Sequence, residues 1–133
     1  MFYRNETHHR LFEHVLSHRY QRTPAMLSAL YLLCADRYLW GLCQDKLEKT
    51  KIYFGEIHLQ DAEPEVYCLL KAAQDMYYGS RNLTIADLSD QELAPPWLYQ
   101  VICNAMAIRR CGIRAVKLAT RQERLMRCGQ WEN

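Results

Sequence analysis

The chain has 133 residues, of which 50% are hydrophobic and 24% are charged, with five glycines, four prolines and a formal net charge of +2 at pH 7. These proportions exclude disordered chains, collagen-like repeats and disulfide-stapled miniproteins, and the length suits a single domain over residues 1–133. No apolar run reaches the roughly 18 residues of a membrane span, and the first residues do not resemble an export signal. We therefore expect a globular cytoplasmic protein.

Two helices are expected in the first third of the chain. Asn5 or Thr7 could cap the first helix, whose apolar residues recur at helical spacing: Leu11, Phe12, Val15 and Leu16. Thr23 and Pro24 predict the start of the second helix, because proline at the first helical position lacks only an amide hydrogen that would stay unpaired. Its apolar residues are Met26, Leu27, Leu30, Leu33 and Cys34.

A third helix is expected to begin at Asp36 and to extend over residues 36–49. Its apolar positions are Leu39, Trp40, Leu42, Cys43 and Leu47, and Gly41 weakens its middle by roughly 1 kcal/mol. Residues 49–64 follow no clean period and contain Gly55, so they predict a long connection that includes a short extended piece.

The strongest helical pattern runs from Glu65 to Gly79, where glycine is well placed to end the helix. Its apolar positions are Val66, Leu69, Leu70, Ala73, Met76 and Tyr77. Thr84 is expected to cap a short turn, and Ser89 with Glu92 three residues later predicts a capping box.

The last helix should begin beside Trp97, after Pro95 and Pro96, with Val101, Ile102, Ala105 and Ile108 facing inward. Gly112 could break this helix, or the helix could continue through it as one rod. Residues 109–133 could form a basic C-terminal extension of the domain. The expected fold is an all-α, single-domain bundle of about five helices with a long, basic C-terminal helix.

Positive charge is concentrated near the C-terminus. Residues 1–100 hold ten basic and thirteen acidic side chains, whereas residues 101–133 hold seven basic and two acidic ones. On a helix, five of these cations fall within an arc of roughly 80°: Arg110, Arg114, Lys117, Arg121 and Arg124. The apolar residues collect across the axis: Ile108, Cys111, Ala115, Val116, Ala119 and Met126.

This basic face has two interpretations. It could be the solvated side of an ordinary amphipathic helix, or it could bind an acidic protein surface or phosphates. Nucleic-acid binding is the less favoured of the two partner types, because the pI is near 8.2 and no aromatic residue lies between Arg109 and Arg127. A membrane-surface helix would favour Trp or Phe on its buried side, and this one has neither.

Few residues predict chemistry. The spacing of His14 and His18 would let both imidazoles reach one metal, but no third ligand can be assigned, so we expect no metal and no cofactor. The six cysteines lack zinc-site spacing and are expected to be reduced core thiols. Cys34, Cys43 or Cys68 with His58 would need an activating neighbour to act as a nucleophile, and phosphate-loop, dinucleotide-binding and nucleophile-elbow motifs are absent.

Two aromatic pairs beside glycines could be exposed contact residues or parts of the core. They are Tyr53–Phe54 before Gly55 and Tyr77–Tyr78 before Gly79. An aromatic core is the favoured interpretation.

The order of five segments resembles a family of short, uncharacterised, all-helical bacterial proteins often encoded on mobile genetic elements. The segments are ETHHRLFEHV, YLLCADRYLW, KIYFGEIH, LLKAAQDMYYG and IADL. The resemblance covers roughly residues 5–109 and implies no catalytic residue. It implies a setting, because accessory genes of phages and conjugative elements frequently encode small proteins that bind and block host machinery.

These observations together predict a protein that binds and is not an enzyme. We expect a mobile-element accessory protein, of the anti-defence or anti-CRISPR-like kind, that docks on a host protein or nucleoprotein through Arg110, Arg114, Lys117, Arg121 and Arg124. The alternative is a small nucleic-acid-binding protein that uses the same helix.

Overall fold

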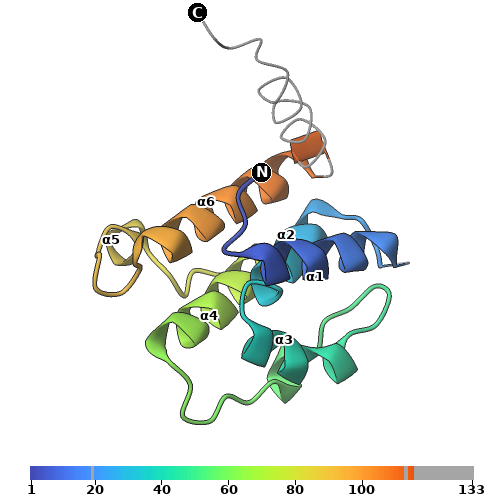
Figure 1. The fold of residues 1–133 in the computed structure, drawn as a ribbon, viewed down its shortest axis with the longest axis horizontal. Coiled ribbons are helices and arrows are strands. Elements are labelled where there is room, and N and C mark those ends of the chain that lie inside the picture. Colours follow the sequence, from blue (N-terminus) through green and yellow to red (C-terminus); the bar gives the residue numbers. More distant parts are fainter. Residues whose placement is uncertain (19, 113, 116–133) are drawn as a thin grey trace, which may run out of the picture.

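The computed structural model describes residues 1–18, 20–112 and 114–115. These residues form six α-helices, two short 3-10 helices and no strand (Figure 1). The helices are α1 (Glu6–Ser17), α2 (Pro24–Leu33), α3 (Arg37–Cys43), η1 (Gln44–Lys46), η2 (Phe54–Glu56), α4 (Pro64–Tyr78), α5 (Ile85–Leu88) and α6 (Pro96–Cys111). The predicted all-α class is confirmed, and none of the described helices has the length and apolarity to cross a membrane.

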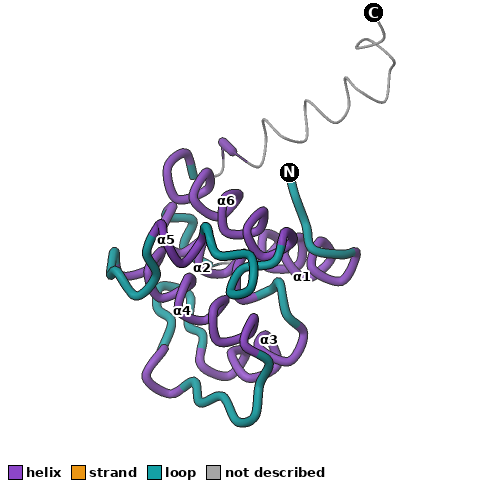
Figure 2. The backbone as a smooth tube through the Cα atoms, turned by 90° about the vertical axis from the view of Figure 1, so that its left-hand side faces the viewer, coloured by secondary structure: helices purple, strands orange, loops and turns teal. Residues whose placement is uncertain are grey.

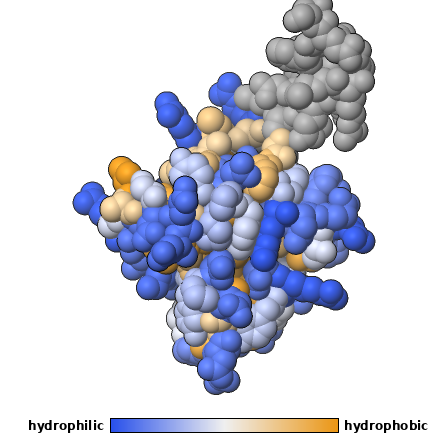
Figure 3. All heavy atoms as spheres, turned by 60° about the vertical axis from the view of Figure 1, so that its left-hand side comes forward, coloured by the Kyte–Doolittle hydropathy of each residue, from blue (hydrophilic) through white to orange (hydrophobic). Residues whose placement is uncertain are grey.

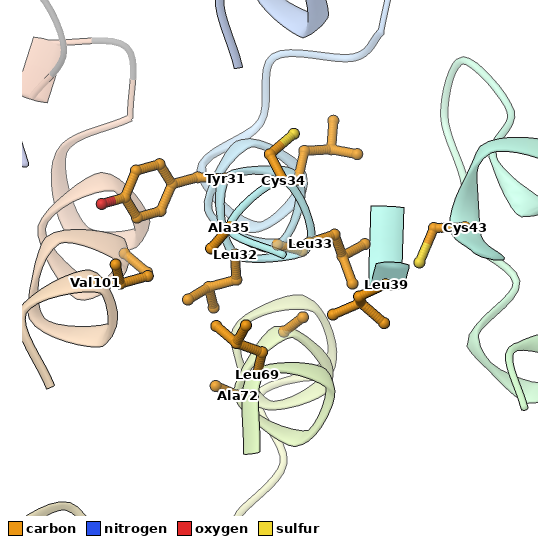
Figure 4. Packing of buried hydrophobic residues seen from close by; sticks show 14 of the residues in the cluster. Tyr31, Leu32, Leu33, Cys34, Ala35, Leu39, Cys43, Leu69, Ala72 and Val101 are labelled. Atoms are coloured by element: carbon orange, nitrogen blue, oxygen red, sulfur yellow. The ribbon is translucent and has the colours of Figure 1, made fainter. Parts of the chain in front are cut away.

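Helix α2 is the centre of the fold. All residues from Met26 to Leu33 are buried, because this helix is apolar on every side and its neighbours surround it. Helices α4 and α6 make the most extensive contacts with α2, while α1 and α3 cover smaller parts of it. In Figure 4, Tyr31 points toward Val101 of α6, and Leu69 of α4 lies beneath Leu32.

The predicted helix ends are largely confirmed by their hydrogen bonds. Asn5, rather than Thr7, caps α1, since its side chain accepts a hydrogen bond from the amide of His8 (2.9 Å). Thr23 caps α2 and Asp36 caps α3 in the same way. Gly79 ends α4 with a left-handed φ of 72°, a conformation that glycine adopts without steric cost.

The third helix is shorter than predicted. It ends at Cys43, and the chain continues into η1 instead of forming the last predicted turns. Leu47 is paired with Ile52 in an isolated antiparallel bridge, so it does not belong to the apolar side of α3. The bridge confirms the short extended piece that was expected in this region.

The predicted capping box at Ser89 and Glu92 is wrong. Ser89 follows α5, and its hydroxyl donates a hydrogen bond to the Ile85 carbonyl (2.8 Å). The capping box lies one turn earlier, where the Thr84 hydroxyl accepts from the Asp87 amide (3.1 Å) and the Asp87 carboxylate accepts from the Thr84 amide (2.9 Å). The Asp at this position performs the role that the prediction gave to a Glu further along the chain.

The N-terminal segment, residues 1–4, runs beside α1 and α6 (Figure 2). The amide of Phe2 donates to the side chain of Asn104 on α6 (3.4 Å). The guanidinium of Arg4 forms an ion pair with Asp36 (3.2 Å) and lies over the ring of Trp97 (3.8 Å). These contacts tie the start of the chain to the helices that surround α2.

Candidate functional site

The structure places two of the five predicted basic site residues. Arg110 lies in the last turn of α6 and Arg114 lies beyond Gly112, and both side chains are exposed. Lys117, Arg121 and Arg124 lie outside the described residues.

Gly112 ends α6. Its φ of 64° and ψ of −146° are not helical, and its amide donates to the carbonyl of Ile108 (2.6 Å) as the helix closes. The sequence left open a continuous helix or a break at Gly112, and the structure shows a break. Arg110 and Arg114 therefore do not follow one continuous helical arc, and the arc of roughly 80° derived for an unbroken helix does not hold across Gly112.

The charge at this end of α6 is not neutralised by the described part of the chain. Neither Arg110 nor Arg114 forms an ion pair with a described residue. The sequence between Leu93 and Gln122 contains no Asp or Glu, so no carboxylate lies on α6 itself. Among the described residues, Arg110 and Arg114 therefore carry positive charge that no carboxylate offsets by an ion pair.

Arg109 has a different role from its neighbour Arg110. Its Nε donates a hydrogen bond to the carbonyl of Met76 (2.9 Å), near the C-terminus of α4. This contact joins the ends of α4 and α6, and a cation near a helix C-terminus is also favoured by the helix dipole. We therefore assign Arg109 to packing between the two helices.

The side of α6 that faces away from α2 carries an exposed apolar stripe. Tyr99 is 47% exposed, Met106 is 42% exposed and Cys103 is half-buried. With Arg110 these residues are spaced four, three and four apart, so they lie along one side of the helix, here called the outer face of α6. Apolar surface gathers in Figure 3 beside the place where the described chain ends.

The opposite side of α6 confirms the predicted inward positions. Val101, Ile102, Ala105 and Ile108 are all buried, and Ala115 packs against the same core beyond Gly112. Cys111, which the helical projection placed on the apolar side, is exposed. Of the predicted apolar side around Gly112, Ile108 and Ala115 thus pack against the domain, whereas Cys111 is exposed to solvent.

The cysteines separate into two groups. Cys34, Cys43 and Cys68 are buried free thiols, as predicted. Burial raises the pKa of Cys34 well above its usual range, that of Cys43 to about 12 and that of Cys68 in the same direction. Since the thiolate is the nucleophilic form, these shifts oppose a nucleophilic role, and His58, which such a role would have used, is on the surface.

The other thiols do not share this environment. Cys103 is half-buried and Cys111 is exposed, so the prediction that every cysteine is a core thiol is wrong for Cys111. The helical pattern placed it inward, but the chain turns at Gly112 and leaves that position uncovered. Cys128 lies outside the described residues.

His14 and His18 are exposed at the end of α1, with ring centroids 4.2 Å apart. A ring nitrogen of His18 is 2.8 Å from the carbonyl oxygen of His14, so the second imidazole is engaged with the helix end. Within residues 1–18, 20–112 and 114–115, no group of three or more His, Cys, Asp or Glu side chains is arranged to hold a metal ion.

The two aromatic pairs meet in space. Phe54 is buried and lies 5.4 Å from the ring of Tyr77 and 5.5 Å from that of Tyr78, centroid to centroid. The Tyr77 hydroxyl accepts a hydrogen bond from the amide of Ile52 (3.2 Å), while Tyr78 is 60% exposed. The favoured core interpretation therefore fits Phe54 and Tyr77, and Tyr78 is a surface residue.

His8 is a buried polar residue that the sequence analysis did not single out. Its Nδ1 accepts a hydrogen bond from the amide of Arg4 (3.0 Å), so the proton is on Nε2, which donates to the carbonyl of Tyr31 (2.9 Å). Burial lowers the pKa of His8 to about 4. The spacing of His8, Phe12 and Val15 placed this histidine on the buried side of α1, and that signal could have identified it.

The described part of the predicted site thus consists of Arg110 and Arg114, and the outer face of α6 is the exposed surface beside them. No family model, no curated protein and no solved structure matches this chain.

Proposed function

We propose that this protein is a non-catalytic binding protein that docks on a partner protein through the outer face of α6 and the basic residues that follow it. The observation that carries the proposal is the exposure of Tyr99 and Met106 on the same side of α6 as Arg110. Tyrosine, methionine and arginine are enriched at protein interfaces, where aromatic and arginine side chains account for much of the binding energy.

The chemistry of the partner follows from the charge. Arg110 and Arg114 have no carboxylate partner among the described residues, so an acidic protein surface would complement them. The mobile-element setting implied by the sequence resemblance favours a host protein or nucleoprotein as the target. In that setting the protein would act as an accessory inhibitor of host defence.

The three buried thiols fit a role without covalent catalysis. Cys34, Cys43 and Cys68 keep their protons at neutral pH because burial raises the pKa of each. A nucleophilic cysteine needs the opposite shift, from a neighbouring cation or a helix N-terminus.

Affinity purification of the full chain from host cells tests the proposal. The wild-type protein should recover a specific partner, and both Met106→Glu and the double variant Arg110→Glu/Arg114→Glu should reduce its recovery about tenfold or more, since a hot-spot loss is about 2 kcal/mol. Arg81→Glu is the matched control, because Arg81 is an exposed arginine in the loop after α4. Equal recovery with all variants would contradict the proposal.

Nucleic-acid binding is distinguished by a mobility-shift assay on the same variants. A shift with DNA or RNA that weakens steeply with salt and is lost in Arg110→Glu/Arg114→Glu would assign the basic residues to nucleic acid instead of protein. Under the proposal, no such shift is expected, and recovery of the protein partner should persist after nuclease treatment.

A further inference from the structure

A pocket of about 450 Å³ lies between α1 and α3, away from the outer face of α6. Its polar lining comes from Thr7 and Arg10 on α1, Arg37 on α3 and Gln44 at the start of η1. This volume is within the range of small-molecule sites, which are roughly 300–1,000 Å³. The pocket belongs to no function that the sequence predicted.

The charge of the lining favours an anion. Two guanidiniums, those of Arg10 and Arg37, line the pocket, and no carboxylate does. Arg37 forms no ion pair with a described residue. Arg10 is 3.9 Å from Glu6 in an exposed pair, and exposed pairs of this kind contribute little. Both guanidiniums are therefore available to a ligand.

The acid that caps α3, Asp36, is already engaged. A smaller pocket of about 260 Å³ shares Thr7 and Arg37 with the first one and is also lined by Arg4 and Asp36. Asp36 accepts hydrogen bonds from the Leu39 amide (3.0 Å) and from the Arg4 guanidinium (3.2 Å). The oxygens of Asp36 are occupied by the cap and by Arg4, and Asp36 forms no ion pair with Arg37.

Trp40 contributes to the wall of the same pocket. The residue is 5% exposed and lines the pocket, and its Nε1 is the one buried side-chain nitrogen or oxygen in the described part of the chain that has no hydrogen-bond partner. This N–H is enclosed by protein atoms, so it reports on events in the adjoining pocket and is not itself a ligand contact.

Gly41 leaves this part of the pocket open. A Cβ atom built on Gly41 meets no other atom within 4 Å, although the residue lies in the middle of α3, where glycine is unfavourable. A Cβ at this position would therefore lie in open space, and Gly41 itself lines the pocket. The position therefore offers a way to narrow the pocket while keeping the helix.

We infer that the α1–α3 pocket binds a small molecule that carries an oxyanion group, a phosphate or a carboxylate, held by Arg10 and Arg37. The planar guanidinium fork donates paired hydrogen bonds to either oxyanion, and arginine is favoured wherever such groups are recognised. The inference does not depend on the proposed docking function, because it uses a different surface.

The test follows the indole N–H signal of Trp40 by ¹⁵N NMR, with the full chain titrated at constant ionic strength. Pyrophosphate is the phosphate probe and succinate is the carboxylate probe, and Trp40→Phe assigns the resonance. We expect a saturable shift of the Trp40 signal with at least one probe, and the probe that binds more tightly identifies the oxyanion. Failure of both probes to shift this signal would overturn the inference.

Charge-matched variants identify the residues that hold the ligand. Arg37→Gln and Arg10→Gln should each weaken binding about tenfold or more, since each removes a charge-assisted hydrogen bond. Arg81→Gln, which removes an exposed arginine that does not line this pocket, should leave the dissociation constant unchanged. Equal weakening by Arg81→Gln would mean that the anion responds only to the net charge of the protein, which overturns the inference.

A steric variant gives an independent arm. Gly41→Leu should leave the protein folded, as checked by a cooperative urea transition, and should weaken binding because the new side chain narrows the pocket. Unchanged affinity in a folded Gly41→Leu protein would place the anion elsewhere.

Discussion

His8 connects three parts of the chain through one side chain. It accepts a hydrogen bond from the Arg4 amide, donates one to the Tyr31 carbonyl, and lies with its ring centroid 4.7 Å from that of Tyr31. Both ring nitrogens are used by the neutral tautomer, so a proton on Nδ1 would face the N–H group of Arg4. A charged imidazole at this buried position would lose that hydrogen bond and its hydration together.

Stability should therefore fall in mildly acidic solution because of His8. Its pKa is about 4 in the folded protein and about 6.5 in the unfolded chain. Between these values the unfolded state binds more protons, so the free energy of unfolding decreases as the pH falls through this window, by about 3 kcal/mol in total. Above pH 6.5 the contribution of His8 is fully present.

Urea titrations at several pH values measure this effect. The wild-type protein should lose stability between pH 6.5 and 4 more steeply than His8→Gln, which cannot be protonated in this range. His58→Gln is the control, because His58 is exposed and its replacement should leave the slope unchanged. If the free energy of unfolding of His8→Gln fell with pH as steeply as that of the wild-type protein, other groups would be the cause of the pH dependence.

Helix α6 depends on glycine at its C-terminal end. Gly112 has a φ of 64° and a ψ of −146°, and a Cβ at this position would lie 3.4 Å from Pro24 Cγ. Residues with a side chain are strained in this part of the backbone map, whatever the free space. Gly41 in α3 differs in both respects, because its backbone is helical and a Cβ there would lie in open space.

Alanine at these two glycines should have opposite effects. Gly112→Ala should lower the free energy of unfolding by about 1–3 kcal/mol because of backbone strain. Gly41→Ala should raise it by about 0.5–1 kcal/mol because alanine has less conformational entropy to lose in a helix. Equilibrium urea denaturation measures both changes, and a neutral Gly112→Ala would contradict the strained geometry at the end of α6.

Local signals predicted most helix ends because caps are made by residues a few positions apart. Asn5, Thr23, Asp36 and Gly79 each act within their own turn, and each was identified from the sequence. The end of α3 was missed because Leu47 pairs with Ile52 across a turn, and this pairing leaves no helical or alternating signature at Leu47 itself.

The candidate site was predicted less completely, because the sequence analysis singled out Arg110 and Arg114 but neither Tyr99 nor Met106. The inward residues of α6 follow the helical period, and the exposed ones, Tyr99 and Met106, lie on the other side. The choice between a rod and a break at Gly112 depends on the conformation of one glycine beside Pro24 of α2, and local sequence does not specify this neighbour. The pocket between α1 and α3 combines side chains from distant segments, so no spacing rule could indicate it.

The whole molecule is organised around α2. Its most extensive contacts are with α4 and α6, which lie on different sides of it, and α1 and α3 cover smaller parts (Figure 1, Figure 4). A helix that is apolar on all sides can be stable only when it is enclosed in this way. The free energy of folding should therefore be most sensitive to truncation within α2.

Two leucine-sized truncations compare the centre with the surface. Leu30→Ala should lower the free energy of unfolding by about 2–5 kcal/mol, since Leu30 is fully buried and a cavity would remain. Ile85→Ala on α5 should change it by less than about 0.5 kcal/mol, because Ile85 is 85% exposed. Similar losses for the two variants in thermal or urea denaturation would contradict the central position of α2.

The outer face of α6 is the surface through which we propose that the molecule acts, and photo-crosslinking in host cells tests this most directly. Tyr99 on α6 and Tyr38 on α3 are each 47% exposed. A benzophenone amino acid is therefore equally accessible at the two positions, and position 38 serves as the control. The account predicts a discrete adduct with one partner protein from position 99, absent from position 38 and lost in Arg110→Glu/Arg114→Glu. Adducts of equal yield from both positions, or none from position 99, would contradict it.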